Sequence, residues 1–207
     1  MNAIVEPDLG SHYVTYFDRV FKRQAAKINP GGYAVTSSDL LLVTVLGSCV
    51  AVCLYEPAIR TGGMNHFMLP GDGAGSTRGE GGMSALYGVN AMELLINGLL
   101  KQGGRKERMT AKVFGGGSVV TSMRDTRIGE RNADFVRRYL ARERIRVVSS
   151  DLLGPYPRKL CYFASTGRAF SKVLHAPEMV VEVGARERAY DGNLRRSMSQ
   201  AGEVELF

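Results

Sequence analysis

The chain has few of the residues that mark exported, metal-binding or membrane-spanning proteins. Its three cysteines, Cys49, Cys53 and Cys161, are an odd number and favour free thiols in a reducing compartment over a disulfide framework. It has no C-x-x-C pair and no cluster of histidines, so we expect no metal and no cofactor. No apolar run is long enough to span a bilayer, and acids occupy the start where a signal peptide needs basic residues. We expect a cytoplasmic protein that is not inserted in a membrane.

The net charge of +7 raises the question of nucleic-acid binding. Between residues 124 and 146 the chain has eight arginines but four acidic residues, so more than half of the excess is local. The sequence lacks an aromatic platform for RNA and any recognition-helix motif, and we expect no nucleic-acid partner. Two interpretations of the arginine-rich segment stay open: a solvated helix face, or a docking surface for an acidic partner.

The most informative stretch is residues 46–70, LGSCVAVCLYEPAIRTGGMNHFMLP. Its Val-rich residues 50–55 predict a strand, residues 56–60 a turn, and residues 62–69 a returning strand. If the turn centres between residues 58 and 59, Cys49 lies opposite Met68 and His66 lies opposite Ala51. The thiol and the imidazole then share one face as diagonal neighbours. A slip of one residue would turn His66 to the other face.

A cysteine beside a histidine suits nucleophilic catalysis. A neighbouring imidazolium lowers the pKa of the thiol and favours the reactive thiolate. Gly47 and Ser48, just before Cys49, suit a tight turn whose N–H groups stabilise a developing oxyanion. The alternative interpretation is that Cys49 is a small buried hydrophobic residue in a Val-rich strand.

Several segments together resemble one known family. The runs LGSCVAVCLYEP and GGMNHFMLP resemble the signature of the CheD family of chemoreceptor glutamine deamidases. Matches continue with KVFGGGS at residues 112–118, IGERNADFVRRYL at residues 128–140, and late strands separated by the turn at residues 165–167. The resemblance implies an enzyme that deamidates selected glutamines to glutamate on the cytoplasmic helices of chemoreceptors in chemotaxis, through a Cys-His thioester mechanism.

The resemblance also implies the roles of individual residues. Cys49 is the nucleophile, His66 takes and returns its proton, and the family's threonine shortly before the cysteine corresponds to Thr44, which orients His66. The remaining expected positions lie near the substrate and its oxyanion: Gly47, Ser48, Gly116 and Gly117. The glycine run at residues 115–117 is not a phosphate loop, because no Gly-Lys-Ser/Thr follows it. Cys53 and Cys161 are interpreted as core residues.

Two other functions stay open beside the deamidase. The first is a regulatory binding module for a CheC-type phosphatase of the response regulator, which the resemblance also implies as a partner. The second is a cysteine hydrolase of similar architecture that acts on another substrate, as glutamine-deamidating bacterial toxins do. The intact pair Cys49 and His66 favours an enzyme, and a monomer is expected.

The organisation along the chain predicts one main domain. Residues 1–30 are interpreted as an N-terminal arm or short helix, because aromatic and apolar residues recur at helix-like spacing within residues 13–27. Residues 31–183 are interpreted as the CheD-like domain, and residues 184–207 as a polar tail that frays. Helices are expected at residues 84–103 and 128–143. Strands are expected, besides the hairpin, at residues 33–36, 40–46, 111–114, 145–149, 159–164, 169–174 and 179–183. The Gly-rich residues 70–82 form either a mobile rim over the site or an ordinary connection.

The fold class follows from this count of elements. Strands are many and helices few, which favours an α+β fold with mostly antiparallel sheets. The family resemblance implies a layered α/β/β/α sandwich.

Overall fold

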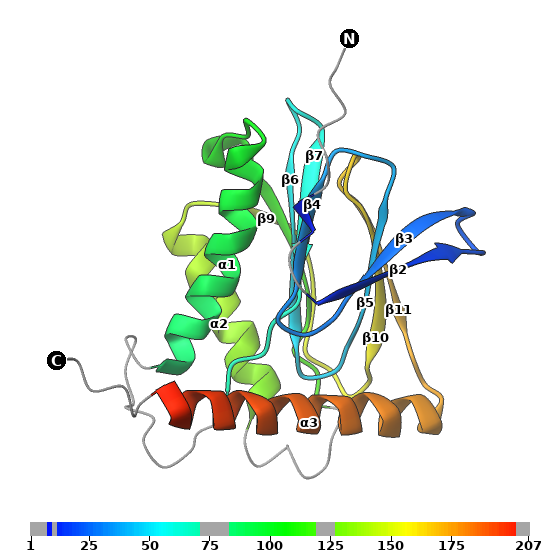
Figure 1. The fold of residues 1–207 in the computed structure, drawn as a ribbon, viewed down its shortest axis with the longest axis vertical. Helices are drawn as coiled ribbons and strands as arrows, with labels where there is room; N and C mark the ends of the chain where they lie inside the picture. The colour runs from blue at the N-terminus through cyan, green and yellow to red at the C-terminus, as the bar shows by residue number, and fades with distance from the viewer. Residues whose placement is uncertain (1–7, 10–11, 71–82, 119–126, 202–207) are drawn as a thin grey trace, which may run out of the picture.

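The protein folds into two packed β-sheets with three α-helices among the residues that the computed structural model describes, 8–9, 12–70, 83–118 and 127–201 (Figure 1). In spatial order, the six-stranded sheet is β1 (Asp8–Leu9), β4 (Tyr33–Thr36), β7 (Thr61–Asn65), β6 (Val50–Glu56), β8 (Thr110–Gly115) and β9 (Arg146–Leu152). The five-stranded sheet is β11 (Arg168–Val173), β10 (Arg158–Phe163), β5 (Leu41–Leu46), β3 (Arg23–Ile28) and β2 (Tyr13–Asp18). All neighbouring strands are antiparallel except β3 with β5 and β8 with β9.

This architecture confirms the expected α+β class with a layered sandwich and mostly antiparallel sheets. Figure 1 shows α1 (Met83–Lys101) and α2 (Ile128–Arg142) over the outer face of the six-stranded sheet. One apolar core lies between that face and the two helices, and a second core lies between the sheets. No helix of the described ranges is long and apolar enough to cross a membrane.

The hairpin of β6 and β7 has the predicted register. Cys53 pairs with Met64, and an isolated bridge joins Val50 to Phe67. Along β6 the side chains alternate as the pleat requires: Ala51 and Cys53 enter the core between the sheets, while Val50, Val52 and Leu54 face α1 and α2. Cys53 is therefore a core residue, as expected, and Cys161 is buried as well.

The N-terminal segment corrects one prediction. Aromatic residues at helix-like spacing suggested a short helix, but residues 13–28 form the antiparallel pair β2 and β3. The turn between them is closed by Asp18, whose carboxylate accepts hydrogen bonds from the N–H groups of Val20 and Phe21 at 2.9 and 3.0 Å. Phe21 then packs edge-on against Phe163, on the outer face of the five-stranded sheet. The aromatic residues thus follow a turn and a sheet face, not a helix.

The structure of the C-terminal segment contradicts two further predictions. Residues 179–183 are not a strand and residues 184–201 are not a frayed tail, because both segments belong to α3 (Pro177–Ala201). Figure 1 shows α3 running crosswise along one end of both sheets. Its buried positions recur at helical spacing, at Val183, Glu187, Asp191 and Leu194. Two of these are acids, so the segment lacks the apolar stripe that marks an ordinary packed helix.

Two expectations fall mostly or partly outside the described residues. The Gly-rich rim was expected at residues 70–82, of which only Pro70 is described. The last six residues of the predicted tail, 202–207, are also outside.

Candidate active site

Residues 47–49 connect β5 to β6 and are called the nucleophile loop here, after the candidate nucleophile Cys49. Its three carbonyl groups are held by hydrogen bonds from other elements. They accept, in chain order, from the backbone N–H of Gly117 at 2.7 Å, the side-chain amide of Asn132 at 2.8 Å and the backbone N–H of Gly116 at 2.7 Å. Because all three carbonyls are bound on the side of β8 and α2, the N–H groups of the loop are left to bind other partners.

The glycine run at the end of β8, residues 115–117, is required by this close approach. Gly115 has a φ of 106° and Gly116 a φ of 66°, both in the left-handed region that favours glycine. A Cβ on Gly115 would lie 2.1 Å from the carbonyl oxygen of Cys49, inside any allowed contact. A tight turn therefore lies beside the nucleophile loop, and its glycines let the two backbones meet.

The N–H groups of the nucleophile loop converge on one carboxylate, that of Glu187 from α3. Its Oε1 accepts from the N–H of Gly47 at 2.9 Å and of Cys49 at 3.1 Å. Its Oε2 accepts from both the N–H and the hydroxyl of Ser48 at 2.8 Å. Convergent backbone N–H groups of this kind form a cradle for a negatively charged oxygen. In this structure the carboxylate of Glu187 fills that cradle.

Thr44 holds the imidazole ring of His66. The distance from His66 Nδ1 to Thr44 Oγ1 is 2.7 Å, and Thr44 Oγ1 donates to the carbonyl of Ile28 at 2.8 Å. Because the threonine's single hydroxyl proton is used at Ile28, these contacts assign the ring proton to Nδ1. Nε2 is then the basic nitrogen. It is buried and has no hydrogen-bond partner among the described residues.

The side chains of Cys49 and His66 are deeply buried, and both lie in the field of Glu187. Cys49 is fully buried and His66 is 3% exposed. Burial raises the pKa of the Cys49 thiol well above its usual range, and the charge and hydrogen bonding of Glu187 raise it further. Burial lowers the pKa of His66 to about 4, although Glu187 acts in the opposite direction. With α3 in this position, both shifts favour a neutral thiol and a neutral imidazole.

A small cavity opens beside His66. It has a volume of about 50 Å³, and Thr44, His66 and Glu187 are among the residues that line it. Its lining includes both apolar and polar side chains, and a cavity of this size has room for water. It lies between β3, β5 and α3.

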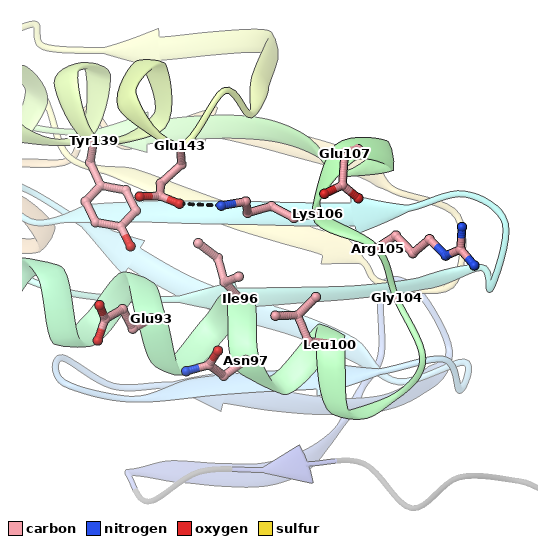
Figure 2. A pocket seen from close by; sticks show the side chains of 10 residues that line it. All are labelled: Glu93, Ile96, Asn97, Leu100, Gly104, Arg105, Lys106, Glu107, Tyr139 and Glu143. Atoms are coloured by element: carbon pink, nitrogen blue, oxygen red, sulfur yellow. Dashed lines mark hydrogen bonds and ion pairs between the residues drawn. The ribbon is translucent and has the colours of Figure 1, made fainter.

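A second pocket, of about 610 Å³, is lined by no residue of this site (Figure 2). Figure 2 shows it between α1 and the end of α2, beside the ion pair of Lys106 with Glu143 at 2.8 Å. Its lining is Glu93, Ile96, Asn97, Leu100, Gly104, Arg105, Lys106, Glu107, Tyr139 and Glu143. We assign it no part in the chemistry at Cys49.

Two residues of the site were not predicted from the sequence. Asn132 is fully buried on α2 and links two segments: it donates to the carbonyl of Ser48 and accepts from the N–H of Leu69, both at 2.8 Å. A polar residue on the apolar stripe of α2 was a usable signal for it. Glu187 gave no such signal, because it stands among many charged residues in a polar segment.

The family model and the curated relatives that match this chain agree on one family. The family model described as CheD chemotactic sensory transduction matches residues 68–173, which begins just after His66. The "Probable chemoreceptor glutamine deamidase CheD 2" of Burkholderia thailandensis is 58% identical over 199 residues, covering 96% of this chain and 100% of that protein. The "Probable chemoreceptor glutamine deamidase CheD" of Burkholderia mallei is 50% identical over 195 residues, covering 93% of this chain and 83% of that protein.

Similarity to solved structures is weaker. Bacillus licheniformis hypothetical protein YfiH has a TM-score of 0.39 and 14% identity, over 58% of this chain and 50% of that one. A likeness of this size carries no argument about function.

Proposed function

This chain belongs to the CheD family, and we propose that it hydrolyses selected glutamine side chains of chemoreceptors to glutamate, with Cys49 as the nucleophile. The names of its relatives indicate this substrate. The observation that carries the chemistry is the cradle of three backbone N–H groups around Cys49. The cradle is accompanied by an imidazole whose unprotonated Nε2 has no partner among the described residues.

Acylation uses the thiol, the imidazole and the cradle together. Nε2 of His66 takes the proton of the Cys49 thiol, and Sγ attacks the side-chain amide carbon of the glutamine. The carbonyl oxygen becomes an oxyanion and binds the N–H groups of the nucleophile loop, where one well-placed donor contributes about 2.7 to 4 kcal/mol. The C–N bond then breaks, ammonia leaves with the proton from Nε2, and a thioester to Cys49 remains.

Deacylation needs one water and the same base. The cavity beside His66 and Thr44 offers room for it. Nε2 removes a proton from this water, the resulting hydroxide attacks the thioester carbon, and the thiolate leaves and is reprotonated. Thr44 is a positioning residue here: it fixes the ring so that Nε2 faces the reaction in both steps.

Receptor conversion tests the proposal. The cytoplasmic part of a cognate chemoreceptor is incubated with native protein, Cys49→Ala or Cys53→Ala, and glutamine-to-glutamate conversion is measured by mass spectrometry of peptides. Cys53 is the matched control because it is a second buried thiol in the same core layer. We expect conversion by native protein and Cys53→Ala, and none by Cys49→Ala. Conversion by folded Cys49→Ala would refute the nucleophile. No conversion by native protein would leave the binding module for a CheC-type phosphatase as the better hypothesis.

A further inference from the structure

The carboxylate of Glu187 occupies the place where the reaction's product would sit. It is a glutamate side chain on an α-helix, and its two oxygens take the N–H groups of all three residues of the nucleophile loop. The negative charge of the same carboxylate also acts on the Cys49 thiol and raises its pKa. Deamidation of a receptor glutamine produces the same group, a glutamate carboxylate presented by a helix beside Cys49.

The turns of α3 on both sides of Glu187 also pack against the site, as those of a docked helix would. Val183, one turn before Glu187, lines the small cavity at His66 together with Glu187. Tyr190, one turn after, makes a hydroxyl-to-hydroxyl hydrogen bond with Tyr87 of α1. Asp191 and Leu194 continue the buried stripe. The outward face carries charged, exposed side chains, among which Glu182 and Arg186 form an ion pair with each other.

We propose that the face covered by α3 is the docking surface for the substrate helix, and that α3 occupies it as an internal product mimic through Glu187. This inference rests on the proposed function, since it takes a helix-borne glutamine as the substrate. The cradle cannot hold two carboxyl-type groups at once, because its donors are all engaged by Glu187. A receptor helix must therefore displace α3, and only the displaced fraction of the enzyme is competent to bind.

The first test turns α3 into a substrate. In Glu187→Gln the side chain keeps its size and presents an amide carbon to Cys49 within the same molecule, where proximity favours reaction. Sγ attacks that carbon, ammonia leaves, and water hydrolyses the thioester, so glutamate returns at position 187. Peptide mass spectrometry of the purified full-length protein detects the exchange of NH₂ for OH. We expect glutamate at position 187 in Glu187→Gln, and intact glutamine in Cys49→Ala/Glu187→Gln.

Glu182→Gln is the matched control for this test. Glu182 lies on the same helix, its side chain is 58% exposed, and its ion pair is with Arg186 of α3 itself. We expect its glutamine to remain. Deamidation there as well as at position 187, or at position 187 without Cys49, would be spontaneous and would overturn the inference.

The second test measures competition in trans. If α3 blocks docking, Glu187→Ala converts a receptor fragment faster than native protein when the fragment is below saturation. We expect a rise in kcat/KM of about tenfold or more, mainly through KM, because removing the mimic raises the competent fraction. Glu182→Gln should match native protein. A folded Glu187→Ala that is slower than native would make Glu187 a participant in catalysis and would overturn the inference.

The two tests separate this inference from the proposed function. Suppose that native protein converts receptor glutamines while the glutamine introduced by Glu187→Gln stays intact. That result would refute the role of α3 and leave the receptor deamidase standing. Cys49-dependent conversion at position 187 in Glu187→Gln, without any conversion of receptor, would support the docked helix and refute the receptor substrate.

Discussion

Acidification should destabilise the fold through His66, and the structure sets the size of the effect. Burial lowers the pKa of His66 from 6.5 to about 4, so the unfolded chain takes up a proton at a higher pH than the folded protein. No stability is lost at pH values above the pKa that His66 has in the unfolded chain. The loss grows as the pH falls toward the lower pKa that His66 has in the folded protein. Between about pH 7 and about pH 5 the free energy of unfolding should fall by about 2 kcal/mol from this residue alone.

The assay is urea-induced unfolding of three proteins at both pH values: native, His66→Gln and His12→Gln. Glutamine does not titrate, so His66→Gln should lose about 2 kcal/mol less than native protein on acidification. His12 is exposed, and its variant should follow native protein. The pKa values of Asp18 and Glu56 are lowered by their partners in the fold, so their contributions are lost only at lower pH. Equal losses in native protein and His66→Gln would refute the buried, neutral imidazole.

Three further predictions follow from individual contacts. Thr44→Val keeps the shape of the side chain but removes the hydroxyl that holds His66 Nδ1. The kcat on a receptor fragment should therefore fall at least about tenfold with little change in KM. An unchanged kcat would contradict the positioning role. Asn132→Leu leaves the carbonyl of Ser48 and the N–H of Leu69 without their partner, and urea unfolding should show a loss of about 2 to 4 kcal/mol, whereas a loss near zero would show that the loop does not depend on it. If the arginines of residues 131–146 form a docking surface, receptor binding measured by titration should weaken as salt rises; affinity indifferent to ionic strength would leave a solvated face.

Local pattern was enough to predict the hairpin and its register. The register follows from the Val-rich residues 50–55 and the turn around Pro57, which fix which residues lie opposite each other. A slip of one residue is disfavoured because it would move every side chain to the other face of the sheet. The pairing of Cys53 with Met64 is the consequence. The helices at α1 and α2 were predictable for a similar reason, because their apolar stripes repeat at helical spacing.

The parts that escaped prediction depend on contacts between distant segments. The stripe of α3 that faces the protein includes Glu187 and Asp191, so burial there cannot be read from hydrophobicity. Glu187 is buried because the N–H groups of residues 47–49 satisfy it, and these lie far away in sequence. The aromatic residues within residues 13–21 misled for a related reason: their spacing fits a helix, but their partners are supplied by other strands of the sheet.

The most direct test of the central claim is capture of the thioester. Native protein is mixed with the cytoplasmic fragment of a cognate chemoreceptor, quenched in acid and digested, and the peptides are searched by mass spectrometry for a link between a cysteine and a receptor glutamine. The account predicts a link at Cys49 that hydroxylamine cleaves, and none at Cys53 or Cys161. Glutamate formation with the link at another cysteine, or with the same yield in Cys49→Ala, would contradict it.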